Sequence, residues 1–242
     1  MAIIRNKNDF VQFEKNYWTY YRELENDFLS MRKYISICKD NFCTYSIEIL
    51  KLYQAVCSEI DVVGKAMAKM LNSTFKPEDK NNNIYKWWYE IQNSFLLTEA
   101  PFTPINPTSK PVRIGLRDYK CCLLNEETLQ PWQSFKIVKQ KTDKWRYSNA
   151  TGSRTPKWWS DYNSVKHTRT SLTSDGNGKM NYSKANLGNL CNAFAALFIL
   201  EKAVIDSIGT KDDLDRFMDH SRLFVNETRY TESEMNQLLY RV

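Results

Sequence analysis

Glycine and proline are scarce in this chain, with seven of each among 242 residues. So few turn-forming residues do not suit a fold built of many short strands and tight turns. The glycine-rich phosphate loops GxGxxG and GxxxxGK(S/T) are both absent, which excludes the common nucleotide-binding motifs. The hydrophobic share of 42% is ordinary for a globular protein and argues against a disordered chain.

Metal ligands and long apolar runs are also lacking. The chain has two His and six Cys with no CxxC pair, so we expect free thiols, no metal site and no cofactor. The longest uncharged apolar run, Ala193 to Leu200, has eight residues, whereas a membrane-spanning helix needs about 20. The start of the chain shows no signal-peptide pattern. We therefore expect a cytoplasmic protein with no membrane partner.

What is present is helical periodicity. Apolar residues that recur every three or four positions predict a bundle of helices, at about 9–35, 42–71, 84–96, 156–169 and 183–208. The first two are expected to pack as an antiparallel pair, and the last, the most hydrophobic, as a buried central helix.

The middle of the chain differs in character. Four prolines between positions 101 and 111 exclude a continuous helix, and short β-like runs follow them. The predicted fold class is mainly α: a helical bundle with two long N-terminal helices and a buried C-terminal helix, in a single domain over 1–242. An irregular, partly β insertion is expected at 98–153.

Positive charge is concentrated in one segment. Positions 136–169 hold nine Lys or Arg against two Asp, a net charge of +7, so the other residues sum to −1. Aromatic residues are interleaved with these cations. Cations contact phosphates and rings stack on bases, so the pattern favours RNA or another single-stranded nucleic acid, although a solvated charged segment is the plain alternative. The expected RNA-binding residues are Lys139, Lys141, Lys144, Arg146, Arg154, Lys157, Trp158, Trp159 and Tyr162.

The candidate for catalysis is His167, because histidine titrates near neutral pH and the chain has only two. On a helix, Asn163 and His167 are four residues apart on one face, with Lys166 beside them and Arg169 on the flank. RNA cleavage by the 2′-hydroxyl needs an acid–base group and cations that stabilise charge on the phosphate, and no metal. The plain alternative is that His167 only packs near a helix end, where its charge suits the helix dipole.

The helical pattern together with Tyr162-Asn-Ser-Val-Lys-His167 resembles the HEPN family of prokaryotic defence and toxin ribonucleases. Asn163 and His167 match the Asn and His of the family motif, whereas Tyr162 stands where the family has Arg, and Arg169 follows the His instead. The resemblance implies a homodimer whose motif helices face each other across a basic cleft. It also implies metal-independent endoribonuclease activity in phage defence, abortive infection or a toxin–antitoxin pair.

Two hypotheses of function follow. The first is an HEPN-like RNA-binding protein that cleaves RNA through His167, supported by Asn163, Lys166 and Arg169, with an antitoxin or another defence-system protein as partner. The second is a non-catalytic helical binding or scaffold protein of a defence or regulatory complex, favoured by the Tyr in place of Arg.

Overall fold

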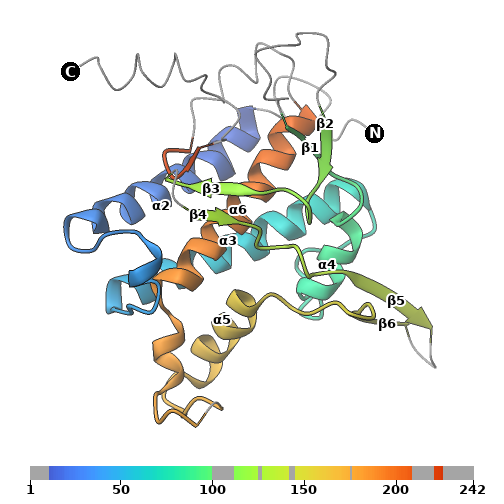
Figure 1. Cartoon of the computed structure of the whole chain (residues 1–242). Coiled ribbons are helices and arrows are strands. Elements are labelled where there is room, and N and C mark those ends of the chain that lie inside the picture. Colours follow the sequence, from blue (N-terminus) through green and yellow to red (C-terminus); the bar gives the residue numbers. More distant parts are fainter. Residues whose placement is uncertain are drawn as a thin grey trace, which may run out of the picture.

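The computed structural model describes residues 11–99, 112–124, 127–141, 145–174, 176–208 and 221–225. This part of the chain is mainly helical, with five α-helices and short strands between α4 and α5 (Figure 1). The predicted fold class, a helical bundle with a partly β insertion, is confirmed.

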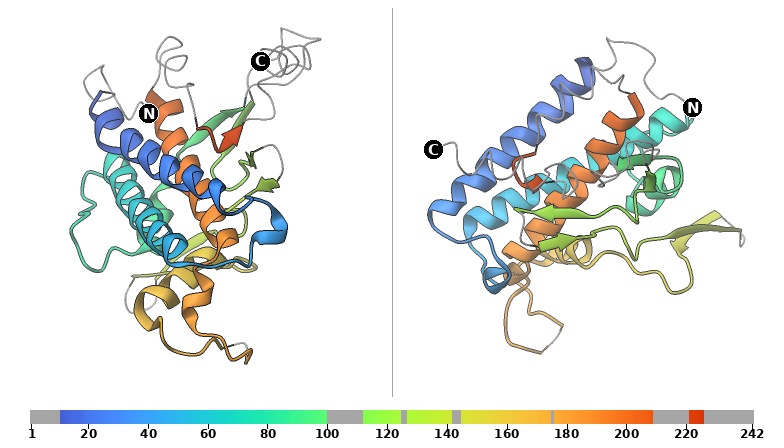
Figure 2. Two further views of the ribbon diagram at one scale, coloured as in Figure 1. Left: turned by 90° about the vertical axis from the view of Figure 1, so that its left-hand side faces the viewer. Right: turned by 45° about the horizontal axis from the view of Figure 1, so that its top comes forward.

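The N-terminal helices form an antiparallel pair. A helical stretch from position 11 includes a π-helical turn (Glu14–Trp18) and continues as α2 (Thr19–Ser30). After two 3₁₀ turns, α3 (Ile47–Leu71) runs back beside α2 (Figure 2). The prediction placed the start of α3 at position 42, but the helix begins after Ser46, whose Oγ accepts a hydrogen bond from the Ile49 amide at 3.2 Å. Such a cap satisfies an otherwise orphaned donor of the first turn.

The centre of the bundle is α6 (Leu187–Ile208), as predicted, and it packs along α3 (Figure 1). By length and composition α6 could also cross a membrane, but 72% of its apolar stretch is buried inside the molecule, as in a core helix. Two glycines permit close packing. A Cβ on Gly64 of α3 would lie 2.6 Å from the Trp87 ring, and one on Gly188 of α6 would lie 3.0 Å from Phe42.

The insertion is built from small antiparallel sheets. Strand β1 (Leu96–Glu99) pairs with β2 (Val112–Gly115), and β5 (Ile137–Lys141) pairs with β6 (Trp145–Asn149). Strand β3 (Cys121–Leu123) lies between β4 (Glu127–Leu129) and β7 (Phe224–Val225). The predicted helix over 84–96 was too long. Helix α4 (Ile84–Ile91) ends earlier, and residues from Leu96 pair with β2 instead.

Tryptophans connect α4, the insertion and α5 (Lys157–Thr168) in the core. The rings of Trp88 and Trp132 stack with centroids 4.2 Å apart, and Trp158 meets Trp132 edge-on at 5.1 Å. Each indole N–H has an acceptor: Trp88 donates to the Phe135 carbonyl at 3.0 Å, and Trp132 donates to the Ala196 carbonyl of α6 at 3.2 Å. Satisfied donors allow these large rings to be buried at little polar cost.

The last described residues, 221–225, are fastened to α2. The carboxylate of Glu25, fully buried on α2, accepts hydrogen bonds from the Ser221 hydroxyl at 2.6 Å and the Leu223 amide at 3.2 Å. Arg22 forms an ion pair with the same carboxylate at 3.0 Å. Residues far apart in sequence are thereby joined, and β7 continues from this contact into the sheet with β3.

Candidate nucleic-acid interface

Helix α5 separates the predicted site residues into a buried and an exposed set. Trp158, Trp159 and Tyr162 are 3%, 6% and 6% exposed, and they pack in the hydrophobic core. The prediction that these three rings stack on RNA bases was wrong. A helix that packs against a core turns its large apolar side chains inward, and aromatic residues within a basic segment follow the same rule.

The exposed set lies at the C-terminal end of α5. Lys166, His167 and Arg169 are exposed, and Asn163 is half-buried. The Lys166 ammonium lies 5.6 Å from the centroid of the Tyr162 ring, a cation–π contact that orients the lysine. The His167 imidazole is accessible to solvent. In the described part of the chain no hydrogen bond joins it to Asn163, so the amide does not orient the ring.

A groove of about 440 Å³ opens beside this helix end. We call it the α5 groove; its lining includes Tyr45, Arg169, Lys179, Met180, Tyr182 and Ser183. Among the residues that the structure describes, no Asp or Glu lines it. The rings of Tyr45 and Tyr182 meet edge-on with centroids 5.6 Å apart. The groove therefore combines Arg169, a predicted site residue, with a cation and two rings that were not predicted, Lys179, Tyr45 and Tyr182.

Sequence analysis missed Lys179, Tyr45 and Tyr182, because they come from outside the positive segment. Lys179 and Tyr182 belong to the segment after α5, which has no helical or strand periodicity, and Tyr45 precedes α3. The one available signal was the sequence Gly-Lys-Met-Asn-Tyr over 178–182, where a cation and a ring stand three residues apart.

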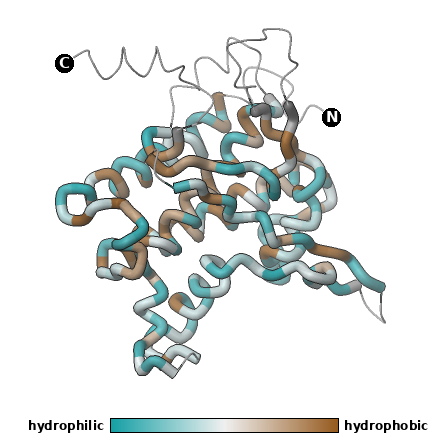
Figure 3. The backbone as a smooth tube through the Cα atoms, in the orientation of Figure 1, coloured by the Kyte–Doolittle hydropathy of each residue, from teal (hydrophilic) through white to brown (hydrophobic). Residues whose placement is uncertain are grey.

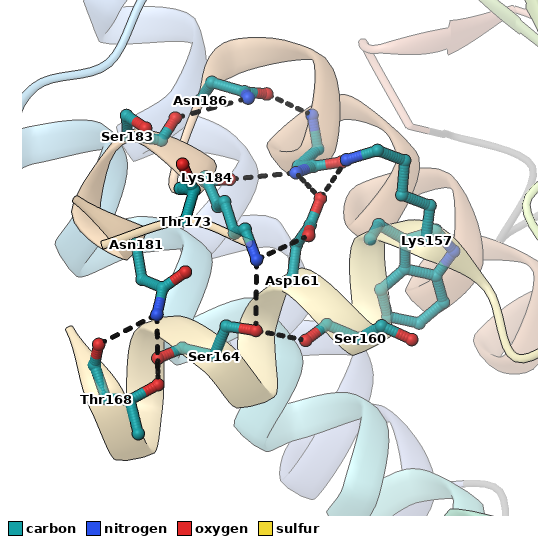
Figure 4. A network of polar contacts seen from close by, with 12 residues as sticks. Lys157, Ser160, Asp161, Ser164, Thr168, Thr173, Asn181, Ser183, Lys184 and Asn186 are labelled. Carbon is teal, nitrogen blue, oxygen red and sulfur yellow. Dashed lines mark hydrogen bonds and ion pairs between the residues drawn. The ribbon is translucent and has the colours of Figure 1, made fainter. Parts of the chain in front are cut away.

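The segment that follows α5 is folded back against it by backbone and side-chain bonds. The Tyr182 amide donates to the Arg169 carbonyl at 3.0 Å, and the Asn181 amide donates to the Ser171 carbonyl at 2.8 Å. The Asn181 side chain donates to the carbonyl and hydroxyl oxygens of Thr168 at 3.0 and 3.1 Å (Figure 4). These contacts place Arg169 and Tyr182 on the same groove.

A buried carboxylate, Asp161, connects α5 to the start of α6 (Figure 4). It accepts a hydrogen bond from the Asn189 side chain at 2.9 Å and lies 3.6 Å from the Lys184 ammonium. Lys157 forms an ion pair with the same carboxylate. Lys157, predicted to bind RNA, has an exposed side chain, but the ion pair with Asp161 partly neutralises its charge. The network fixes α5 and the short 3₁₀ helix Asn181–Lys184 relative to each other.

The remaining predicted cations lie elsewhere. Lys139, Lys141 and Arg146 are exposed on the hairpin β5–β6, which projects from the molecule well apart from the C-terminal end of α5 (Figures 1 and 2). Arg154, in the turn before α5, is exposed as well. Lys144 lies outside the described residues. The positive segment is thus not one continuous surface, because α5 turns back onto the core after the hairpin.

The residues at the C-terminal end of α5 and after it are polar enough to face solvent. The helix and the segment after it are mostly hydrophilic or neutral (Figure 3). Within the described ranges, no group of three or more His, Cys, Asp or Glu is placed to hold a metal ion. Comparisons with family models, curated proteins and solved structures gave no match.

Proposed function

We propose that the protein binds RNA at the C-terminal end of α5 and cleaves it without a metal, with His167 as the acid–base group. The observation that carries the proposal is the exposed His167 two residues before Arg169, which lines a groove shared with Lys179 and two tyrosines. This chemistry requires an acid–base group, cations and stacking rings. His167 offers the first, and the groove that includes Arg169 offers the others.

Each group has a role in the proposal. Arg169 and Lys179 contact phosphates, and Arg169 also stabilises the charge that develops on the phosphate in the transition state. Tyr45, which is 43% exposed, and Tyr182 offer ring faces to an unpaired base. Lys166 adds positive potential next to His167, and Asn163 positions the imidazole once RNA is bound, because hydrogen bonds at catalytic groups often tighten in the complex.

The HEPN resemblance deepens this proposal. In that family the motif acts across a homodimer, and a second copy facing α5 would bring two basic grooves together. Tyr162, at the family's Arg position, is buried, so Arg169 is the cation we assign to the developing charge. A cytoplasmic role in phage defence or a toxin–antitoxin pair, with an antitoxin partner, belongs to the same proposal.

The second candidate function is a non-catalytic RNA-binding or scaffold protein. It is favoured by the absence of a hydrogen bond between Asn163 and His167 among the described residues, since an unoriented imidazole is a weak catalyst. In that case, the α5 groove binds RNA and leaves it intact.

The first test is cleavage of a mixture of unstructured RNAs by the wild-type protein, with and without chelator. We expect cleavage that chelator does not affect and that His167→Ala slows by about 10²–10⁴-fold, the usual contribution of acid–base catalysis. Intact RNA with the wild-type protein, together with measurable binding, would support the scaffold function instead.

The second test measures the binding of a fluorescent single-stranded RNA as a function of salt. Arg169→Ala/Lys179→Ala should weaken binding and reduce the log–log salt slope by about 1.4, because each lost phosphate contact on a single strand removes about 0.7. The control removes the same charge away from the groove, at the exposed Lys33 and Lys80. Equal affinity and slope in both double variants would exclude the α5 groove as the phosphate-binding surface.

A further inference from the structure

A second and larger groove, of about 950 Å³, lies between α2 and α3. One wall is lined by residues that fall on one side of α2 and of the 3₁₀ turn after it: Tyr20, Glu23, Leu24, Asp27 and Met31. Residues of α3 line the other wall: Glu48, Ile49, Leu52 and Ala55. We call it the α2–α3 groove. Side chains of the two helices thus form its two walls.

The base of the groove is apolar and its rim is aromatic. Leu24, Ile49 and Leu52 are buried at 4%, 2% and 7% exposure, and they close the base. At the rim, Tyr20 is 43% exposed and Tyr34 is 90% exposed. A tyrosine this exposed beside an apolar groove is typical of a binding surface, because its ring supplies contact area that the free protein leaves in water.

The charge of the groove is negative. Glu23 and Asp27, one turn apart on α2, are exposed, and no ion pair involves either of them in the described part of the chain. Among the described lining residues Lys51 is the one cation; it is paired with Glu48 at 2.8 Å, and Asp27 is near enough to help raise the pKa of its ammonium. With Glu23, Asp27 and Glu48 against Lys51, the lining carries a net charge of −2.

We propose that the α2–α3 groove binds an amphipathic helix of a protein partner that carries Lys or Arg along one flank. The lining of the wall on the α2 side extends from Tyr20 to Met31, 11 residues further along the chain, which corresponds to about 16 Å, or three helical turns. An elongated apolar groove between two helices accepts a third helix with apolar anchors at i, i+4 and i+7. The cations of that helix would face Glu23 and Asp27.

Charge and shape distinguish this occupant from the alternatives. An acidic or neutral helix would leave the carboxylates of Glu23 and Asp27 opposed or unpaired, which reduces affinity. The cation-rich element of a second copy, the hairpin β5–β6, is a two-stranded ribbon and not a helix. The groove is separate from the α5 groove in its lining residues, so the proposal does not depend on RNA cleavage.

The test uses a fluorescein-labelled peptide of about 14 residues, four helical turns, with Leu on one face and Lys on the flanks. Its binding is measured by fluorescence anisotropy, against a scrambled peptide of the same composition and an acidic Leu/Glu peptide. We expect saturable binding of the basic amphipathic peptide and binding at least about tenfold weaker for the other two, because only the first matches both shape and charge.

Variants localise the binding. Ala55→Trp fills the groove and should abolish binding, whereas Ser58→Trp, on an exposed position of the same helix, should not. Glu23→Gln/Asp27→Asn keeps the shape and should raise Kd by about threefold to tenfold, as expected for two exposed charge pairs. The double variant removes two exposed carboxylates only, so it tests the site even if Ala55→Trp fails to fold.

Four outcomes would overturn the proposal. Three concern the peptides: equal binding of the basic and scrambled peptides, unchanged binding by a folded Ala55→Trp variant, and no binding at all. The fourth is a wild-type dimer that Ala55→Trp converts to a monomer in sedimentation, which would assign the groove to a second copy. We expect these variants to leave RNA affinity unchanged, because their residues lie outside the α5 groove. Failure of this proposal is therefore distinguishable from failure of the proposed function.

Discussion

Two buried carboxyl groups, Glu59 on α3 and Glu201 on α6, lie in the core with Tyr17 nearby. Burial raises the pKa of Glu59 to about 7. Burial also raises the pKa of Glu201 well above its usual range, and the nearby Glu59 raises it further. Neither oxygen of Glu201 has a hydrogen-bond partner among the described residues. Such groups stay neutral in the folded protein at a pH where they ionise in the unfolded chain.

This difference gives a pH-dependent stability. Below pH 4.5 both states hold the Glu59 proton; between 4.5 and 7 the unfolded chain releases it and the folded protein does not, so stability falls as pH rises. The shift corresponds to about 3 kcal/mol, lost by pH 8. Urea denaturation should show that Glu59→Gln loses less stability than wild type between pH 4 and pH 8, by about that amount.

The matched control is Glu48→Gln, an exposed carboxyl whose partner Lys51 is exposed as well. Its stability should follow the wild-type pH profile within about 0.5 kcal/mol, because exposed ion pairs contribute little. Parallel pH profiles for wild type and Glu59→Gln would show that Glu59 has the same pKa in the folded protein as in the unfolded chain.

At the scale of the element, α6 carries the core. Leu197 lies fully buried at the middle of α6. Leu197→Ala should lower the free energy of unfolding by roughly 2–5 kcal/mol, because apolar burial is lost and a cavity is left behind. Chemical denaturation measures this loss. Ser207→Ala, near the end of the same helix, should cost less than about 1 kcal/mol. A loss of less than 1 kcal/mol for Leu197→Ala would show that α6 is not the central helix.

The helices were predictable because their apolar periodicity extends over many turns, as in α3 and α6. Their ends were not predictable, because a single side chain or a tertiary contact decides where a helix ends. Ser46 caps the start of α3, and the residues after α4 pair with β2 as a strand. The small strands of the insertion are short, so their pairing depends on contacts such as that of β3 with residues 224–225, which no local pattern encodes.

The candidate site was only partly predictable. Helical spacing correctly placed Asn163 and His167 on the same face of α5. It did not reveal that the neighbouring rings face the core, since composition records that aromatic residues are present but not which side of the helix the core occupies. Lys179 and Tyr45 reach the α5 groove through the chain fold alone.

At the scale of the molecule, Glu25 joins the first part of the chain to the last described part. Glu25→Ala would leave the Ser221 hydroxyl and the Leu223 amide without their acceptor, and should cost roughly 2–4 kcal/mol. Thermal or urea unfolding gives the cost, and hydrogen exchange at the Leu223 amide should accelerate beyond the global effect. Glu23→Ala, two residues away on the exposed side of α2, should change stability by less than about 0.5 kcal/mol. Similar losses in both variants would mean that the contact with 221–225 contributes nothing.

The tryptophan cluster has an optical consequence. Trp87, Trp88, Trp132, Trp158 and Trp159, five of the seven tryptophans, form a chain of ring contacts with centroids 4.2–6.2 Å apart, shielded from water. Excitation passes readily between rings at such separations, and shielded indoles emit at shorter wavelengths than hydrated ones. Most of the intrinsic emission therefore comes from one dry cluster that collisional quenchers do not reach. We expect a ligand in either groove to leave the tryptophan emission spectrum unchanged, whereas unfolding of the core shifts the emission maximum to longer wavelength.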